Sequence, residues 1–292
     1  MAGRAAGSVF LLTDYGLADE FAGVVRASVV RHAPGAPIID LTHGVTPYDV
    51  RAGALTLVRA VPHLGPGVVL AVVDPAVGTE RRALAVSVVP ARHDDAPRHF
   101  VGPDNGLLPW AVDVLGGVDR VVALRAPHPS GSGSGAGSGA GATFDGRDVF
   151  APAAARLWQG VPMAELGDEV DPAGLVRLTP PRVVASSGAL EVEVQWVDRF
   201  GNVQLAASPA DADAAGLGAQ LEAEPHVVGS VVHRARRVAA FASLAPGELG
   251  LIVDANGHLS LVCDRQSAAT VLGVKSGDNV TMRAVASGRT SP

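Results

Sequence analysis

Residues 67–74 read GVVLAVVD, an unbroken apolar run that ends on an acid. A strand with one face in water alternates apolar and polar side chains, whereas a run like this is typical of a strand covered on both faces. Further strand-like apolar runs occur at residues 8–14, 37–43, 83–89, 99–104 and 120–126. Because helical patterns separate several of these runs, we predict an α/β domain with a mostly parallel sheet flanked by helices.

Three stretches have the spacing of helices. In residues 19–32 apolar side chains recur every three or four positions. The stretch 46–61 opens with Thr46 and Pro47, which we predict to be the N-cap and the first helical residue. A third helix is predicted over residues 146–160. These helices would cover both faces of the sheet.

The period of the pattern changes in the C-terminal part of the chain. Residues 190–198 read LEVEVQWVD, in which apolar side chains alternate with polar ones, as in a half-buried strand with Trp196 on the apolar side. Strand-like runs also occur at residues 249–254, 258–264 and 279–285. We therefore predict a smaller, all-β, barrel-like domain over residues 186–292, after an N-terminal domain over residues 1–180. The Gly- and Ser-rich residues 129–142 are expected to form a flexible insert without chemistry.

Charge and cysteine content argue against several classes of protein. The 292 residues carry a formal net charge of −6 and their Lys and Arg residues are scattered, which argues against nucleic acid as a partner. No stretch reaches the ~18 apolar residues of a transmembrane helix, so no membrane partner is expected. Cys263 is the only cysteine, and neither a disulfide within the chain nor a thiolate metal cluster can form. We expect a cytoplasmic protein without a metal site.

Acids follow three of the predicted strands, at Asp14, Asp74 and Asp104. Ligands of open α/β sheets bind beyond the carboxyl ends of the strands, although an Asp there can also be a simple capping residue. No glycine-rich phosphate loop follows a strand, so a polyphosphate ligand is not expected. Carboxylates suit ribose hydroxyls, an ammonium or a sulfonium instead. The isolated His43 is expected to be a structural hydrogen-bonding residue.

Six stretches of the chain match, in order, the motifs of one enzyme family. They are FLLTDYGLADEF (10–21), IIDLTHGVTPYDV (38–50), VVDPAVGTERR (72–82), VGPDNGLLPW (101–110), TFDGRDVFAPAAA (143–155) and VDRFGNVQL (197–205). Together they resemble the S-adenosylmethionine (SAM) hydroxide adenosyltransferases, which are related to fluorinase and chlorinase. The resemblance covers nearly the whole chain outside the Gly/Ser insert.

The resemblance implies an enzyme that cleaves SAM to adenosine and L-methionine by attack of water on the ribose C5′, without a cofactor. It also implies a homotrimer whose sites lie between the N-terminal domain of one subunit and the C-terminal domain of the next. By similarity, Asp14 would bind the ribose hydroxyls, with Tyr48 near the sugar. The other implied substrate contacts are Asp19 and Asp198 for the methionine ammonium, Phe200, Asn202 and Phe241 for the adenine, and Phe144 and Gly146 for the wall of the reacting pocket.

The catalytic residues implied by the resemblance are Asp74, Arg81 and Asp145. In the hydrolytic family an Asp, an Arg seven residues later and a His act on the water, and Asp74 and Arg81 match the first two in type and spacing. Asp145 stands where the family has the His. We expect Asp74 and Asp145 to share the task of deprotonating or orienting water, with Arg81 moderating the pair. Gly146 stands where fluorinase has a halide-binding Ser, and it offers no hydroxyl for fluoride.

Two other functions stay open at this point. A chlorinase-like halogenase would share the fold, but the carboxylate of Asp74 would repel a halide, and the halogenating relatives have a Tyr at that position. A SAM-binding module without catalysis stays open because Asp145 departs from the family pattern. From the residues alone, core packing would account for Phe200 and Phe241, and a hairpin turn for Asn202.

Overall fold

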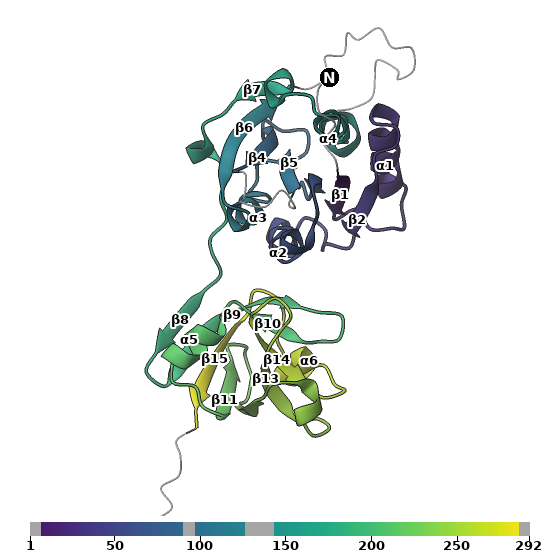
Figure 1. Ribbon diagram of the computed structural model, residues 1–292. Coiled ribbons are helices and arrows are strands. Elements are labelled where there is room, and N and C mark those ends of the chain that lie inside the picture. Colours follow the sequence, from purple (N-terminus) through teal and green to yellow (C-terminus); the bar gives the residue numbers. More distant parts are fainter. Residues whose placement is uncertain (1–6, 90–96, 126–142, 286–292) are drawn as a thin grey trace, which may run out of the picture. The chain divides into compact units, whose positions relative to one another are not determined.

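The computed structural model describes residues 7–89, 97–125 and 143–285 (Figure 1). Contacts between Cα atoms divide the chain into two compact units, Met1–Leu178 and Thr179–Pro292, and each is described by itself. The predicted flexible insert, residues 129–142, lies outside the described residues. No described helix combines the length and the apolar composition that a bilayer-crossing segment needs.

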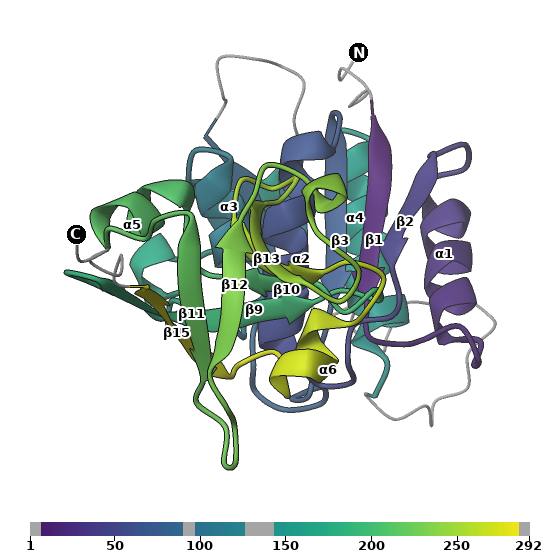
Figure 2. The ribbon, with the colours of Figure 1, turned by 90° about the horizontal axis from the view of Figure 1, so that it is seen from below.

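The N-terminal unit contains a seven-stranded sheet in the order β2-β1-β3-β5-β4-β6-β7. Its strands are β1 (Ser8–Thr13), β2 (Ile38–Thr42), β3 (Gly67–Val72), β4 (Ala83–Val88), β5 (Pro97–Pro103), β6 (Val118–Leu124) and β7 (Gly167–Glu169). The strands β2, β1, β3 and β5 are parallel neighbours, and the first three run side by side in Figure 2. The prediction of a mostly parallel sheet is confirmed. The strand β4 is antiparallel to β5 and β6, and β7 is antiparallel to β6. The connection from Val88 to Pro97 is too short for the crossover helix that a parallel β4–β5 pair would need.

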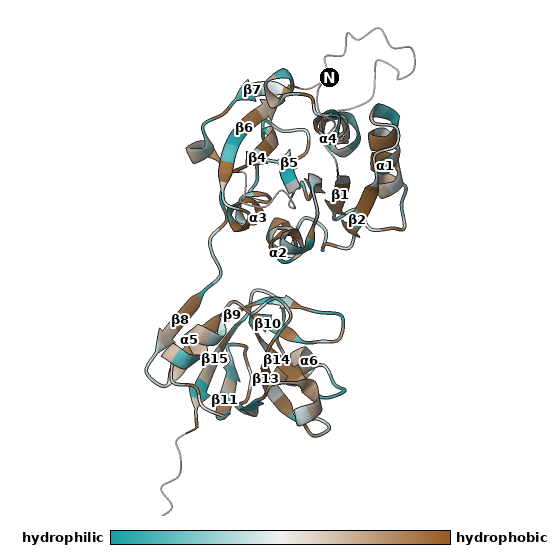
Figure 3. Cartoon of the chain, viewed as in Figure 1, coloured by the Kyte–Doolittle hydropathy of each residue, from teal (hydrophilic) through white to brown (hydrophobic). Residues whose placement is uncertain are grey.

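Helices cover both faces of this sheet. They are α1 (Phe21–His32), α2 (Val50–Ala60), α3 (Pro109–Val114) and α4 (Ala151–Trp158), with short 3-10 turns at Val61–His63, Met163–Glu165 and Pro172–Gly174. Alternate residues of β1 enter different cores: Leu11 packs with α1 and α4, and Leu12 packs with α2 and α3. These two pairs of helices lie on opposite sides of the sheet in Figure 1. Much of β1 is accordingly hydrophobic in Figure 3.

The second helix begins later than its sequence predicts. It starts at Val50 with Asp49 as its N-cap, whose carboxylate accepts the N–H of Ala52 at 2.8 Å, so the prediction of Thr46 as N-cap and Pro47 as the first helical residue is wrong. Between them Tyr48 adopts a left-handed conformation with φ of 67°. A left-handed, bulky residue cannot continue a helix, so the helix has to begin after it.

The third predicted helix forms with an unusual first turn. Residues Gly146–Phe150 are a π-helical turn, and the α-helix α4 follows directly. π-Helical turns are rare in proteins, and those that occur are often found at functional sites. Their wider backbone changes the direction in which the neighbouring side chains point. This turn begins immediately after Asp145.

The C-terminal unit is a closed β-barrel, as predicted. Its strands are β8 (Val183–Ser186), β9 (Ala189–Val197), β10 (Val203–Leu205), β11 (Gln220–Pro225), β12 (His233–Arg237), β13 (Leu249–Val253), β14 (Leu259–Cys263) and β15 (Asn279–Ala284). Seven of them follow one another in the order β10-β14-β13-β12-β11-β15-β9, and pairing of β9 with β10 closes the ring, with β8 added beside β9. The helices α5 (Pro209–Ala214) and α6 (Ala268–Leu272) and a 3-10 turn, Phe241–Ser243, lie between strands.

The inner side of β9 follows the predicted alternation only in part. Leu190, Val192 and Val194 are fully buried in the barrel core. Trp196 is 39% exposed, so its predicted place on the same apolar side is wrong. Leu205 of β10 pairs with Val194 while its neighbour Gln204 pairs with Trp196, which leaves an extra residue in β9. Such a bulge reverses the side to which the following residues point.

Candidate active site

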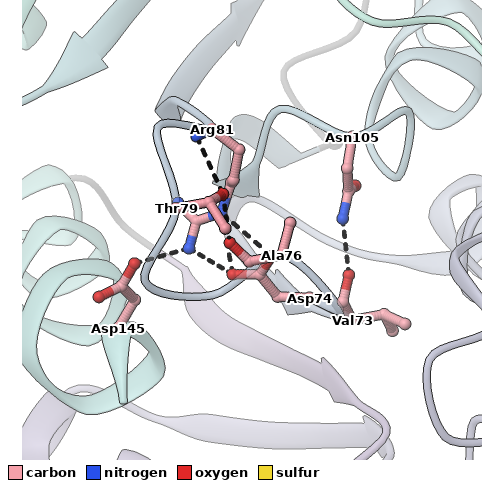
Figure 4. Close-up of polar contacts among 7 residues, drawn as sticks. All are labelled: Val73, Asp74, Ala76, Thr79, Arg81, Asn105 and Asp145. Atoms are coloured by element: carbon pink, nitrogen blue, oxygen red, sulfur yellow. Dashed lines mark hydrogen bonds and ion pairs between the residues drawn. The ribbon is translucent and has the colours of Figure 1, made fainter. Parts of the chain in front are cut away.

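A cluster of Asp74, Arg81 and Asp145 lies beyond the carboxyl end of β3 (Figure 4). The Arg81 Nε donates to both carboxylate oxygens of Asp74, at 3.0 Å and 2.9 Å. The Arg81 Nη2 donates to Asp74 Oδ2 and, at 2.6 Å, to Asp145 Oδ2. The three side chains are 5%, 9% and 21% exposed in chain order. The structure therefore brings all three predicted catalytic residues into one half-enclosed site.

The turn between Asp74 and Arg81 is held by its own hydrogen bonds. The Thr79 hydroxyl donates to the carbonyl of Ala76 at 2.7 Å and accepts the N–H of Arg81 at 3.3 Å (Figure 4). The side-chain amide of Asn105 donates to the carbonyl of Val73 at 2.8 Å. Both ends of the turn are thereby fixed, so Asp74 and Arg81 meet without reorganisation.

The π-helical turn holds the third member of the cluster. The carbonyl of Phe144 accepts the N–H groups of Arg147 and Asp148, at 3.0 Å and 3.1 Å, which closes the chain around Asp145. The ring of Phe150, at the other end of the turn, lies 5.1 Å from the guanidinium carbon of Arg81. One short segment thus gives Arg81 both a carboxylate and an aromatic face.

The cluster carries more negative than positive charge, since two carboxylates share one guanidinium. Burial acts to lower the pKa of Arg81, and the hydrogen bonds and charges of Asp74 and Asp145 outweigh it, so the pKa of Arg81 is raised. Arg81 therefore remains a cation. Both oxygens of Asp74 bind Arg81, whereas Asp145 uses only Oδ2, and among the described residues its Oδ1 has no hydrogen-bond partner. Asp145 Oδ1 is the carboxylate oxygen most available to a water molecule.

Asp14 and Tyr48 meet at the carboxyl end of β1. The backbone N–H of Tyr48 donates to Asp14 Oδ2 at 2.9 Å, and the left-handed backbone of Tyr48 makes this contact possible. The Tyr48 side chain is 74% exposed. These two predicted substrate-binding residues are neighbours, and strain of this kind is common where a side chain must be held for function.

His43 braces the same strand end, as the sequence predicted for a structural histidine. It is 5% exposed, and its Nδ1 lies 2.8 Å from the hydroxyl of Thr13, which in turn accepts the N–H of Tyr15 at 3.2 Å. The carbonyl of His43 accepts the N–H of Gly16 at 2.7 Å. The loop that carries Asp14 is therefore tied to β2 on both sides.

Three aromatic side chains pack on one another beside the cluster. The rings of Tyr15, Phe21 and Phe144 form a triangle with centroid separations of 5.3–6.0 Å. Phe144 was predicted to lie at the pocket wall, whereas neither Tyr15 nor Phe21 was predicted to be a site residue. In the sequence, only their place in the stretch 10–21 indicated them: Tyr15 directly follows Asp14, and Phe21 lies two residues after Asp19.

Two acids of the N-terminal unit do not join the cluster. The side chain of Asp104 is 4% exposed, binds Arg82 with a carboxylate oxygen 2.8 Å from the Arg82 Nε, and accepts the N–H of Val176 at 3.0 Å. Asp104 is therefore a structural residue, the simpler of the two roles considered for it. Asp19 is exposed and has no hydrogen bond or ion pair with any described residue. It stays a predicted ligand contact.

The four predicted substrate residues of the C-terminal unit line one hollow of about 690 Å³. They are Asp198, Phe200, Asn202 and Phe241, and the hollow is completed by Cys263, Arg265, Gln266 and Ser267. Asp198 Oδ1 accepts the N–H groups of Phe200 and Asn202, at 2.8 Å and 2.9 Å, and Oδ2 accepts the Asn202 amide at 2.7 Å. Asp198 therefore shapes the turn that presents the other two.

The two phenylalanines of this hollow are not core residues. Phe200 is 75% exposed and Phe241 is 44% exposed. Two exposed aromatic rings beside a side-chain amide are costly in water and suit a flat, hydrogen-bonding ligand such as a nucleobase. Core packing, the alternative that the sequence left open for both, does not explain them. Asn202 lies in the hairpin turn, which was the alternative role considered for it, and it also lines the hollow.

Comparison with known proteins agrees with this arrangement. Models of the N-terminal and C-terminal domains of SAM hydroxide adenosyltransferases match residues 9–167 and 192–281. The chain belongs to this family. Its SAM hydroxide adenosyltransferase motifs are the ones that supply the cluster and the hollow, since Asp74, Arg81 and Asp145 fall in the first matched range and Phe200 in the second.

Individual relatives cover almost the whole chain. The "(R)-S-adenosyl-L-methionine hydrolase" of Salinispora tropica is 43% identical over 272 residues, which are 93% of this chain and 96% of that protein. A solved structure of an uncharacterized conserved protein from Thermotoga maritima is 32% identical, with a TM-score of 0.80 over 94% of this chain and 99% of that one. The fluorinase of an Actinoplanes species is more distant, at 25% identity over 94% of this chain and 96% of its own length.

Proposed function

We propose that this protein hydrolyses SAM to adenosine and L-methionine by in-line attack of water on the ribose C5′. The observation that carries the proposal is the cluster of Asp74, Arg81 and Asp145, with one carboxylate oxygen left without a partner among the described residues. The names of its relatives, which include (R)-S-adenosyl-L-methionine hydrolases, support the choice of substrate.

The reaction needs little more than a well-placed water. Its oxygen forms a bond to C5′ while the C5′–S bond breaks, and the electron pair of that bond moves to sulfur, which leaves as the neutral thioether of methionine. Asp145 Oδ1 accepts the proton that the water loses, and Asp74 fixes Arg81, which fixes Asp145. Positioning and proton removal are therefore the two contributions of these residues.

The charge of the cluster favours water over a halide. Two carboxylates beside one guanidinium leave an excess of negative charge, which attracts the sulfonium substrate. A bare halide between the same carboxylates would be repelled. The cluster therefore argues against the halogenase alternative.

The remaining substrate contacts follow the chemistry of SAM. Asp14 would accept hydrogen bonds from the ribose hydroxyls, with Tyr48 beside the sugar, and Phe200, Phe241 and Asn202 would hold the adenine. Asp19 and Asp198 would bind the methionine ammonium. Asp198 already accepts three N–H groups, and a carboxylate has about four acceptor positions, so one remains for the ligand.

Truncation of the aromatic hollow should weaken binding without slowing the chemical step. Loss of stacking on one base costs ~1–3 kcal/mol, so Phe200→Ala should raise KM for SAM about 5- to 160-fold and change kcat less than about twofold. Steady-state kinetics of adenosine release measures both. Val228→Ala removes a fully exposed apolar side chain outside the hollow and is the matched control. A loss of kcat at unchanged KM would show that Phe200 does not bind the base.

We further propose a cytoplasmic homotrimer whose sites combine the N-terminal unit of one subunit with the C-terminal unit of the next. The family resemblance supports the trimer, and the single cysteine, Cys263, supports a reducing compartment. The reaction would need no cofactor, because the sulfonium is itself a good leaving group.

One incubation distinguishes the candidate functions. The protein is mixed with SAM in the presence of EDTA, with and without chloride, and the products are separated by chromatography. We expect adenosine and L-methionine in equal amounts under both conditions. 5′-Chloro-5′-deoxyadenosine would instead identify a halogenase, and tight binding of SAM without product would identify a binding module. Activity that EDTA abolishes would contradict the expected independence of a metal.

A further inference from the structure

Tyr15 lies where the ends of β1 and β3 approach the π-helical turn. It follows Asp14 directly, and its backbone N–H donates to the Thr13 hydroxyl at 3.2 Å. Its own hydroxyl lies over Gly146, because a Cβ added to that glycine would be 2.4 Å from the Tyr15 oxygen. Gly146 is the residue next to Asp145, so the phenol oxygen lies beside the catalytic cluster.

The Tyr15 ring is held, whereas its hydroxyl is not used. The ring contacts Phe21 and Phe144, with centroid separations of 6.0 Å and 5.8 Å. Among the described residues the hydroxyl has no hydrogen-bond partner. A phenol usually finds a partner when most of its ring is covered, so a fixed hydroxyl without one is a candidate for contact with a ligand or a water.

The surroundings keep this phenol protonated. Burial raises the pKa of Tyr15, and the carboxylates of Asp14, Asp74 and Asp145 raise that pKa further. At neutral pH Tyr15 is therefore a neutral O–H donor beside a cluster made of two carboxylates and one guanidinium.

We propose that Tyr15 is a further catalytic residue, whose phenol donates a hydrogen bond to the attacking water. This inference rests on the proposed hydrolysis of SAM. A water that gives one proton to Asp145 and directs one lone pair at C5′ has a second lone pair, and the Tyr15 hydroxyl would bind it. Three of the water's directions are then fixed, which favours the in-line geometry.

The same contact explains why residue 146 has no side chain. A Cβ at residue 146 would lie only 2.4 Å from the Tyr15 hydroxyl oxygen, so that hydroxyl would have to move. The next nearest atoms to the Cβ, one in Phe144 and one in the Tyr15 ring, would lie 3.3 Å away. Tyr15 and Gly146 are therefore a matched pair, and a substitution of one should depend on the other.

The test is Tyr15→Phe, which removes the hydroxyl and keeps the ring among Phe21 and Phe144. We expect kcat for adenosine formation to fall about tenfold or more, with KM changed less than about twofold and Tm unchanged. An unchanged kcat would overturn the inference, and so would a loss of kcat accompanied by a lower Tm, which would indicate a packing role. The wild-type arm tests the proposed function separately, because it must release adenosine before any variant is compared.

A second pair of variants tests the contact itself. Gly146→Ala should lower kcat in the wild-type background, because its methyl group displaces the Tyr15 hydroxyl. In the Tyr15→Phe background the same substitution should cost much less, because the clashing oxygen is gone. Equal losses in the two backgrounds would show that the hydroxyl is not over Gly146 in the working enzyme and would overturn the inference.

Discussion

Asp145→Asn should lower the rate of adenosine formation about 10²- to 10⁴-fold, the contribution typical of a positioned general base. The variant keeps the size of the side chain, and its amide oxygen can still accept from Arg81, so the cluster should remain assembled. It cannot accept the proton of the attacking water. Rapid-quench or steady-state measurement of adenosine gives kcat, and KM for SAM should change little.

Asp148→Asn is the matched control for this substitution. Asp148 lies in the π-helical turn that follows Asp145, is 45% exposed, and pairs with its neighbour Arg147 instead of Arg81. We expect its kcat to remain within about twofold of wild type. Asp145→His, which introduces the residue that the hydrolytic family has here, should be more active than Asp145→Asn, because an imidazole can accept a proton. Full activity of the Asn variant would mean that Asp145 is not the base.

The sheet and the barrel could be predicted from the sequence because burial leaves a periodic pattern. A strand such as β3, covered on both faces, has to be apolar at every position, and β9 has to alternate. Local departures left no such signal. The bulge that turns Trp196 outward depends on the register of β10, and the late start of α2 depends on Asp14, which lies 34 residues before Tyr48.

Only part of the site was predictable from the residues themselves. Asp74 was indicated by its place at the end of a strand, whereas Arg81 and Asp145 were indicated only by the family motif. Asp145 reaches Arg81 across 64 residues, and no local pattern marks such a contact. The sequence led to the same expectation for Asp104 and Asp14, because each is an acid at the end of a predicted strand. Their roles differ in the structure, since the carboxylate of Asp104 is bound to Arg82. Tyr15 was missed because nothing in its neighbours shows that its hydroxyl reaches Gly146.

Two variants with defects in different halves of the site should restore each other at low SAM if each site combines two subunits. Asp145→Asn damages the N-terminal unit, and the double variant Phe200→Ala/Phe241→Ala damages the C-terminal unit. In mixed trimers, a site is intact when its N-terminal half comes from the second variant and its C-terminal half from the first. With equal amounts and random exchange, about a quarter of the sites meet both conditions. Activity at low SAM should therefore recover to about a quarter of wild type.

The recovery depends on the arrangement of the site, so its absence is equally informative. If each site were built within one subunit, every subunit would carry a defect in its only site, and mixing would restore nothing. Co-expression with two different affinity tags, followed by sequential purification, isolates the mixed assemblies, in which one site of three is intact, so the activity of this purified fraction should be about a third of wild type. Sedimentation of the same samples should give three times the mass of one chain. A dimeric or monomeric mass would contradict the trimer, and recovery without mixed assemblies would point to contamination of one variant by wild type.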